Sequence, residues 1–251
     1  MGGHLANTMM QMTLEGRRLF LQGGQELGLD LEPYLPRFAR FYELLNLVNQ
    51  STNLTAIRDE QGIVLKHFLD SLTCLSYSGF IDGLSVIDVG TGAGFPGLPL
   101  AIVRPNIHFD LLDATQKKVG FVAQVIQDLG LSNAQALWGR AETLARQNVK
   151  RETYDAALTR AVASLATVAE LTLPLVRMGG FVIAQKGAGA EAEAEQAQGA
   201  LRRLGGVVEH ILRLTLPRTG DERALVIIQK ISPSPLEYPR KPGVPAKNPL
   251  S

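Results

Sequence analysis

The residues with the clearest chemical signature lie in one short segment, VIDVGTGAGFPG, at positions 86–97. Its first half is typical of a buried β-strand, and Gly90, Gly92 and Gly94 follow as a glycine-rich turn. Glycine permits a tight turn and lets a ligand come close to the backbone. A helix that begins at Pro96 or the next residue loses no hydrogen bond to the proline. Strand, turn and helix in this order indicate a cofactor-binding loop rather than a plain structural turn.

Two cofactors compete for this turn. Gly92, Gly94 and Gly97 satisfy the pattern that places the pyrophosphate of a dinucleotide such as NAD at a helix N-terminus. In that fold the first glycine ends the strand, whereas here the strand ends before Gly90. Asp88, two residues before Gly90, suits a cofactor with a cationic ammonium group, as in S-adenosylmethionine. The register therefore favours S-adenosylmethionine, and NAD is kept as the alternative.

An acidic residue at the end of the next strand is the second requirement of both cofactors, because it binds the ribose hydroxyls. Asp113, in the run LLDAT, stands 19 residues after Gly94. It meets the requirement under either interpretation and does not distinguish the two cofactors.

The elements that must position these residues follow from the alternation of β-rich and helical runs after Gly83. The β-rich runs are LSVIDV, HFDLLDA, AQALWGR, YDAALTRA, GGFVIAQKG, VVEHILRL and ALVIIQK. Such alternation is typical of βα crossovers that build a parallel sheet with helices on both faces. The last two runs are separated by LPRTGDERA, which is too short for a helix, so they are expected to form an antiparallel hairpin. We expect an α/β, Rossmann-like fold with a seven-stranded, mostly parallel sheet and ligands at the carboxyl ends of its strands.

Three regions are predicted along the chain: a helical subdomain over 1–83, the α/β domain over 84–231 and a tail over 232–251. In the first region apolar residues recur at steps of three and four between Leu35 and Leu45, as on one face of a helix. The tail holds six prolines and a net charge of +2, so it is expected to form neither a helix nor a central strand. A solvated arm is favoured over an RNA-binding one.

Composition limits the classes of partner. Lys and Arg number 25 against 24 Asp and Glu, for a formal net charge of +1, so a nucleic acid must be held by local contacts. Cys74 is the only cysteine, which excludes an intramolecular disulfide and a CxxC site and favours a reducing compartment. There is no signal sequence and no long apolar run, so we expect a cytoplasmic protein without membrane contact.

The sequence resembles a known family, the bacterial guanine-N7 methyltransferases of small-subunit ribosomal RNA, also called glucose-inhibited division protein B. The matching segments are NLTAI at 53–57, HFLDS at 67–71, VIDVGTGAGFPGLPLAIVRP at 86–105, LLDATQKKVGFV at 111–122, GRAE at 139–142, TRAVASL at 159–165 and GDERALVII at 220–228. They span nearly the whole chain, although the tail after Ile231 is longer than the family needs. The resemblance implies S-adenosylmethionine as cofactor and 16S ribosomal RNA as substrate, alone or within a ribosomal subunit or assembly intermediate. As a separate expectation, the protein is taken to be a monomer.

The family's cofactor site carries over to matching positions. Gly90 and Phe95 would frame the methionine and sulfonium side, and Asp113 would take the ribose. Ala114 and Thr115 would line the turn beside the ribose. Thr115 has a second possible role, as the N-cap of the following helix.

The remaining cofactor residues follow the third and fourth strands. The resemblance implies that Ala141 and Glu142, in GRAE, lie against the adenine edge, with helix capping as the alternative role of Glu142. Arg160 follows the fourth strand, where the resemblance implies a place beside the transferred methyl group.

The implied chemistry needs no general base, because guanine N7 already carries a free lone pair. Holding two reactants within reach can supply up to roughly 7 to 11 kcal/mol of barrier reduction. The sequence agrees, since its four histidines show no metal or triad spacing and no nucleophilic Ser or Cys motif occurs. We therefore expect neither a catalytic base nor a metal ion.

Basic residues at or near the expected ligand-facing ends of strands, or in the loops there, are the candidates for holding RNA. They are Arg140, Lys186 and Arg223, with structural ion pairing as the alternative role of each. His67 and Asp70, in HFLDS, are expected on the substrate side, unless they only cap and pack a helix. The target guanine should lie in a loop, a bulge or another open segment, because the major groove of A-form RNA is deep and narrow.

Three functions from different classes remain open at this point. An RNA methyltransferase would bind S-adenosylmethionine and methylate ribosomal RNA. An NAD-dependent oxidoreductase would need a substrate domain with a catalytic His or Tyr arrangement, which is not evident. A non-catalytic ribosome-binding module would keep the fold without a working cofactor site, and the intact Asp88, glycine turn and Asp113 oppose this.

Overall fold

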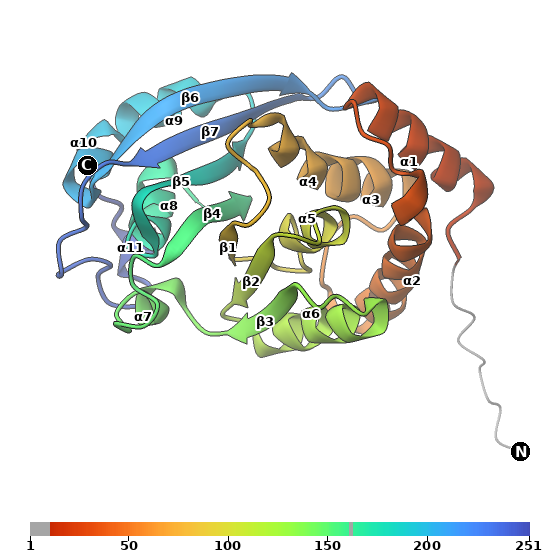
Figure 1. The fold of residues 1–251 in the computed structure, drawn as a ribbon, viewed down its shortest axis with the longest axis horizontal. Coiled ribbons are helices and arrows are strands. Elements are labelled where there is room, and N and C mark those ends of the chain that lie inside the picture. Colours follow the sequence, from red (N-terminus) through yellow and green to blue (C-terminus); the bar gives the residue numbers. More distant parts are fainter. Residues whose placement is uncertain (1–10, 161–162) are drawn as a thin grey trace, which may run out of the picture.

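A seven-stranded β-sheet runs through the middle of the molecule in the order β3-β2-β1-β4-β5-β7-β6 (Figure 1). In this computed structural model, residues 11–160 and 163–251 are described; His4 and two residues of the TRAVASL segment, Ala161 and Val162, lie outside the described residues. The strands are β1 (Ser85–Val89), β2 (His108–Asp113), β3 (Ala134–Trp138), β4 (Tyr154–Arg160), β5 (Val176–Lys186), β6 (Gly206–Thr215) and β7 (Glu222–Lys230).

The directions of the strands confirm the predicted sheet. β1 to β5 pair in parallel, whereas β7 pairs antiparallel with both β5 and β6. The β6–β7 hairpin therefore closes one side of the sheet, as expected from the short linker between its strands. Because β1, β4 and β5 are neighbours and parallel, their carboxyl ends meet at one edge, where the polar residues described below gather.

Helices cover both faces of the sheet (Figure 1). On one face lie α1 (Leu14–Glu26), α2 (Leu35–Thr52), α3 (Glu60–Ile63), α4 (Asp70–Leu72), α5 (Gly97–Val103) and α6 (Gln116–Leu129). The 3₁₀-helices η1 (Glu32–Tyr34) and η3 (Thr73–Ser76) and the π-helix η2 (Val64–Leu69) lie on the same face. On the other lie α7 (Ala141–Leu144), α8 (Leu165–Thr172), α9 (Ala190–Gln196), α10 (Gln198–Leu204) and α11 (Val244–Lys247). Each face has its own apolar core.

The N-terminal helices share a core with the sheet. Phe41 of α2 stacks on Phe95 at 5.3 Å between ring centroids and lies 5.3 Å from Phe68. The tip of the β6–β7 hairpin lies beside α1, where Arg218 donates to Gln22 at 3.0 Å (Figure 1). The helices before Gly83 and one face of the sheet after it share a single apolar core. The boundary predicted near Gly83 therefore does not divide this core.

The C-terminal tail differs from the expectation that it holds no helix. Residues Val244–Lys247 form α11, with Pro245 at its second position. Proline is tolerated there because the N–H groups of a first helical turn have no acceptor within the helix. No helix within the described part of the chain is long and apolar enough to cross a membrane.

Candidate functional site

The glycine-rich turn begins where the sequence places it. β1 ends at Val89, and the three glycines of the turn have positive φ angles: 76° at Gly90, 62° at Gly92 and 94° at Gly94. Residues with a side chain rarely adopt positive φ angles, so the turn itself requires glycine at these three positions. At Gly94 a Cβ atom would also approach the Leu98 side chain to 2.2 Å. The turn leads into α5, which begins at Gly97 as predicted.

Asp88 lies beneath this turn and braces it. One carboxylate oxygen, Oδ2, accepts hydrogen bonds from Thr91 Oγ1 at 2.7 Å and from the Gly97 amide at 2.9 Å. The other oxygen, Oδ1, is buried and has no hydrogen-bond partner among the described residues. Complete burial raises the pKa of Asp88 to about 6. An unpartnered buried oxygen is costly, and a donor from a cationic ligand would satisfy it.

Asp113 joins the two turns that follow β1 and β2. Its Oδ2 accepts from the Gly92 amide at 3.0 Å and its Oδ1 accepts from the Thr115 amide at 2.7 Å. Each carboxylate oxygen can accept a further hydrogen bond, so ligand hydroxyls can still bind here. Thr115 is the N-cap residue of α6, but its side chain makes no capping hydrogen bond, and Ala114 and Thr115 are both exposed.

The end of β3 lies directly beside Asp113, because Asp113 pairs with Trp138 in the sheet. The Trp138 indole donates to the Ala114 carbonyl at 3.2 Å and is 64% exposed, although tryptophan usually buries its ring. Sequence reasoning missed this residue, and the only signal was an aromatic residue just before GRAE. Arg140, exposed and with no acidic partner among the described residues, precedes α7.

Ala141 and Glu142 are both buried at the start of α7. The Glu142 carboxylate accepts at 2.8 Å from the amide of Gly243, in the C-terminal tail, and not from its own helix. The helix-capping alternative therefore does not describe this side chain. Contact with adenine stays a prediction.

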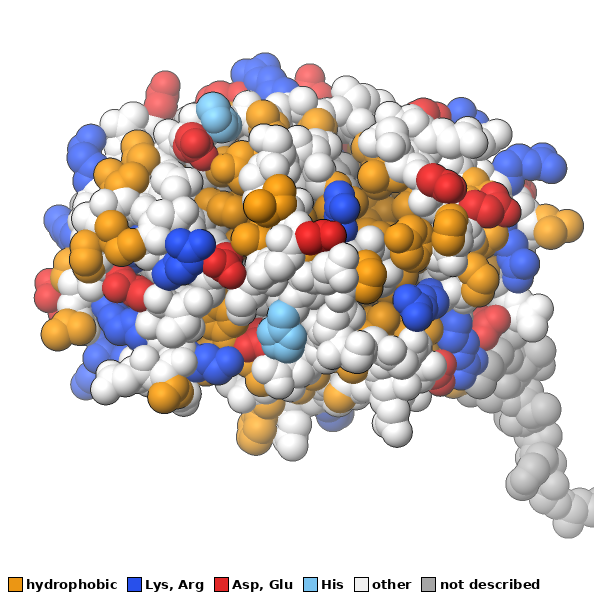
Figure 2. All heavy atoms as spheres, viewed as in Figure 1, with side chains coloured by type: hydrophobic (Ala, Val, Ile, Leu, Met, Phe, Trp, Pro, Cys, Tyr) orange, Lys and Arg blue, Asp and Glu red, His pale blue; other side chains and the backbone are white. Residues whose placement is uncertain are grey.

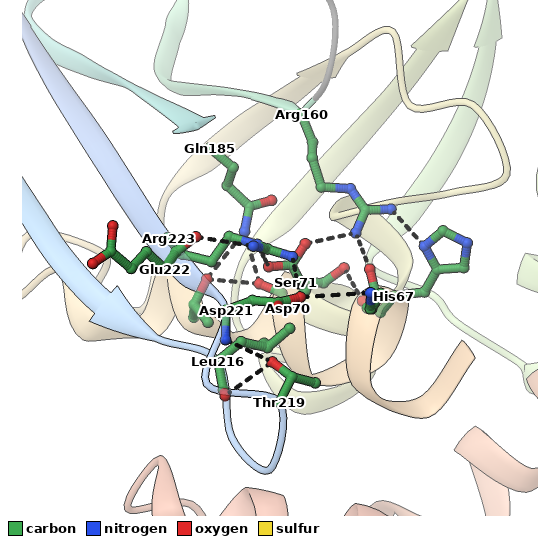
Figure 3. A network of polar contacts seen from close by, with 12 residues as sticks. His67, Asp70, Ser71, Arg160, Gln185, Leu216, Thr219, Asp221, Glu222 and Arg223 are labelled. Carbon is green, nitrogen blue, oxygen red and sulfur yellow. Dashed lines mark hydrogen bonds and ion pairs between the residues drawn. The ribbon is translucent and has the colours of Figure 1, made fainter. Parts of the chain in front are cut away.

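A polar cluster at the carboxyl ends of β4 and β5 and the amino end of the antiparallel β7 forms the other half of the site (Figure 3). Arg160, the last residue of β4, donates to the Lys66 carbonyl at 2.9 Å and to Asp70 Oδ2 at 3.1 Å. Its guanidinium also lies 5.1 Å from the centre of the Phe95 ring. These contacts hold Arg160 against both the glycine turn and the N-terminal helices.

His67 is fixed between Arg160 and Phe95. Its ring stacks on Phe95 at 4.4 Å, its Nδ1 lies 3.1 Å from Arg160 Nη2, and its Nε2 lies 2.7 Å from Thr55 Oγ1. Arginine can only donate, so Nδ1 accepts and the ring proton lies on Nε2, which donates to Thr55. Burial and the neighbouring Arg160 lower the pKa of His67 to about 3, and the ring is neutral near pH 7.

Asp70 binds two arginines. Arg223 Nε donates to Asp70 Oδ1 at 2.8 Å, on the opposite side from Arg160, and the Asp70 side chain is 7% exposed (Figure 3). The backbone carbonyl of Asp70 accepts from Gln185 Nε2 at 2.7 Å. Arg223 Nη2 also lies 3.8 Å from Asp221, which Lys66 approaches at 3.5 Å. Three basic residues, Arg160, Arg223 and Lys66, thus face the two carboxylates of Asp70 and Asp221, and the group carries one net positive charge. Sequence reasoning missed Gln185.

The predicted substrate residues do not all come together. Arg223 and His67 belong to the cluster around Arg160, but Lys186 faces the other side of the sheet because neighbouring residues of a strand alternate. Lys186 donates to Glu193 of α9 at 2.8 Å and to the Ala163 carbonyl. Its geometry matches the structural ion pair that was the alternative role. Lys and Arg are interspersed with Asp and Glu on the face shown in Figure 2, in keeping with the near-neutral charge.

Comparison with known sequences gives a consistent result. The family model described as GidB, rRNA small subunit methyltransferase G, matches residues 35–224. A protein of Deinococcus deserti named ribosomal RNA small subunit methyltransferase G is 49% identical over 95% of this chain and 98% of its own length. A protein of the same name from Pelotomaculum thermopropionicum is 47% identical over 91% of this chain and 96% of its own. Since the tail makes up about 8% of the chain, the first match includes part of the tail.

Solved structures with the same fold are more distant in sequence. An S-adenosylmethionine-dependent methyltransferase from Aquifex aeolicus has a TM-score of 0.55 at 17% identity, covering 72% of this chain and 98% of its own. The cyclase SpnF has a TM-score of 0.51 at 16% identity, covering 65% of this chain and 82% of its own. The fold therefore does not determine the reaction. The match over residues 35–224 and the relatives of nearly equal length show that this chain belongs to the GidB family, rRNA small subunit methyltransferase G.

Proposed function

We propose that this protein transfers a methyl group from S-adenosylmethionine to N7 of a guanine in 16S ribosomal RNA. The family and the names of its members support ribosomal RNA methylation. The hydrogen bonding within the polar cluster supports N7 as the acceptor atom. In it, His67 uses both ring nitrogens and both oxygens of Asp70 accept from arginine. Gln185 Oε1, the acceptor of the cluster without a partner among the described residues, is an amide oxygen and not a base, so neither it nor the engaged His67 and Asp70 is placed to take a proton. This arrangement suits an acceptor atom that has no proton to lose.

The residues at the ends of β1 and β2 fit S-adenosylmethionine. The unpartnered Oδ1 of Asp88 lies under the glycine turn, and Asp113 lies beside that turn with further acceptor capacity. When bound, this cofactor supplies an electrophilic methyl group on a cationic sulfur. The three positive-φ glycines let a ligand approach the backbone, and Asp113 orients hydroxyl groups. The NAD alternative loses support, because the relatives named above are methyltransferases.

Arg160 and Phe95 have a positioning role in this proposal. Arg160 remains charged at any working pH, and its four contacts keep it at the mouth of the site. The catalytic contribution of the protein is then the alignment of two reactants without proton transfer. The Phe95 ring is 4% exposed and supports both His67 and the guanidinium of Arg160.

RNA recognition rests on a few local charges. Arg140 is exposed without an acidic partner in the described structure, and the ion-pair group of Arg160, Arg223 and Lys66 with Asp70 and Asp221 adds one net positive charge. Such contacts bind phosphate without sequence information, so the shape of an open RNA segment must select the target. Free 16S RNA, a ribosomal subunit and an assembly intermediate are the candidate forms of the substrate, and the enzyme is expected to act as a monomer.

The experiment is to map tritium from methyl-labelled S-adenosylmethionine onto purified 16S RNA, ribosomal subunits and assembly intermediates. One labelled guanine, identified as N7-methylguanine after digestion, is the expected result. Label on another atom would overturn the N7 assignment. Binding of NAD with no binding of S-adenosylmethionine would overturn the cofactor, and specific RNA binding without either cofactor would favour the non-catalytic module.

A further inference from the structure

The C-terminal segment, residues 232–251, is bound to the two helices that follow β3 and β4. We propose that it is a positioning element that holds the start of α7 and helix α8 in the arrangement needed for cofactor binding. This inference rests on the proposed function, in which the residues after β3 line the adenine side of the cofactor and those after β4 line the methyl side.

The segment is first anchored at its base. Lys230, the last residue of β7, is 1% exposed and pairs with Glu152 at 2.9 Å. It also donates to Ser234 Oγ, and Ser234 Oγ in turn donates to the Leu204 carbonyl at 2.7 Å. A buried ammonium with these partners fixes where the segment leaves the sheet.

Two arginines from the loop after α7 then bind the backbone of the segment. Arg151 donates to the carbonyls of Ser234 and Tyr238, both at 2.8 Å. Arg146 donates to the Pro239 carbonyl at 2.7 Å. Prolines supply carbonyls but no N–H groups, so an extended proline-rich chain offers acceptors that match arginine donors.

A bidentate ion pair joins the segment to α8. Arg240 makes a bidentate pair with Glu170, with Nη2 at 2.6 Å from Oε2 and Nε at 2.9 Å from Oε1, and its backbone amide donates to the same Oε1 at 2.8 Å. Glu170 is fully buried. A buried carboxylate with one bidentate partner depends on that partner, because removal of the arginine leaves an uncompensated charge.

The last contact reaches the predicted cofactor loop itself. The Gly243 amide donates at 2.8 Å to Glu142, which is 6% exposed, and Thr167 of α8 donates to the Pro245 carbonyl at 3.1 Å. Helix α7 has only four residues, too few to be stable by itself. Its first turn, which includes the predicted adenine-side residues Ala141 and Glu142, is therefore tied to the segment from outside the helix.

Arg240 and Lys241 offer a matched test, because both are basic neighbours but the Lys241 side chain is exposed and has no partner among the described residues. We expect Arg240→Ala to raise the Kd and KM for S-adenosylmethionine by about three-fold or more, with kcat at saturating cofactor within about two-fold of wild type. Lys241→Ala should leave Kd, KM and kcat unchanged. Arg240→Lys, which keeps the charge but not the bidentate geometry, should lie between the two.

Calorimetry of cofactor binding is carried out well below the melting temperature of each variant. An unchanged Kd in Arg240→Ala with a lowered melting temperature would mean that the segment only stabilises the fold, and the inference would be wrong. If Arg240→Ala does not fold, Gly243→Ala takes its place, since φ at Gly243 is +83° and a Cβ there meets no neighbouring atom within 4 Å. A normal Kd in that variant would also overturn the inference. A wild-type protein that fails to bind S-adenosylmethionine would instead contradict the proposed function.

Discussion

Arg160 Nη2 donates to His67 Nδ1 across 3.1 Å, between residues that lie 93 positions apart in the chain. This hydrogen bond fixes the neutral tautomer of His67 and connects the end of β4 to the N-terminal helices. Phe95, from the glycine turn, lies against both side chains. Three parts of the chain that are distant in sequence are thus held together where methyl transfer is proposed.

The rate of methyl transfer should vary little with pH. His67, with a pKa lowered to about 3, is neutral above about pH 6.5, and Asp88, with a pKa raised to about 6, is already mostly ionised at that pH. With saturating cofactor and RNA, the single-turnover rate is therefore expected to be flat between about pH 6.5 and 8.5. A log-linear rise across this interval, with intact RNA and protein, would show that a proton must leave before transfer.

Below neutral pH, the protonation of His67 should lower the stability of the folded protein. An unfolded histidine titrates near 6.5, whereas His67 in the folded protein has a pKa of about 3. The unfolded chain binds this proton first, so stability is lost as the pH falls from about 6.5 toward 3, by at most about 1.4 kcal/mol per pH unit.

His67→Gln isolates this contribution when the free energy of unfolding in urea is measured for both proteins at about pH 7.5 and 5.5. The raised pKa of Asp88 acts in the opposite direction, favouring the folded state as the pH falls below about 6, and cancels in the comparison. The stability advantage of wild type over His67→Gln should shrink at the lower pH. A constant advantage would contradict the low pKa of His67.

Asp113→Ala should weaken S-adenosylmethionine binding by about 1 to 3 kcal/mol, because it leaves ligand hydroxyls and two backbone amides without their acceptor. Isothermal calorimetry measures the change, and Asp110→Asn, in the middle of the same strand and away from its carboxyl end, serves as the control. An unchanged Kd in a folded Asp113→Ala protein would remove Asp113 from the site.

Replacing Arg140 should affect RNA binding but not stability, whereas replacing Arg223 should affect both. Arg140→Ala is expected to weaken RNA binding and to reduce the salt slope of the affinity by about 1, with an unchanged melting temperature. Arg223→Ala should lower the melting temperature as well, because buried Asp70 loses one of its two partners.

Arg203→Ala is the control for charge, since Arg203 is exposed on α10, away from the carboxyl edge of the sheet. Filter binding at several salt concentrations provides the affinities. RNA affinity of Arg140→Ala equal to that of Arg203→Ala would exclude Arg140 from the RNA surface.

Trp138 is the only tryptophan and lies beside Asp113, so it should report cofactor binding directly. Titration with S-adenosylmethionine is expected to change its fluorescence, with a midpoint equal to the calorimetric Kd. The signal should require a higher cofactor concentration in Asp113→Ala. A fluorescence unaffected by saturating cofactor would place the ligand away from the ends of β2 and β3.

Local pattern was enough to predict the sheet and the two turns that follow β1 and β2. Strand alternation, a run of glycines and a proline in a first helical turn act through the backbone within a few residues, so they can be read without the rest of the chain. The order of the elements also determined the antiparallel hairpin, because its linker leaves no room for a crossover helix.

Contacts between distant residues were decided only by the tertiary structure. Asp70 meets Arg223 across 153 positions, and Glu142 meets Gly243 across 101, because the sheet topology and the path of the tail bring them together. Lys186 is predicted from the sequence to hold RNA. The pleat of β5 instead directs its side chain to the face of the sheet that carries α9, where it pairs with Glu193. Charge pairs of this kind have no local signature, since the sequence shows which side chains are charged but only the packed fold determines which partner each one finds.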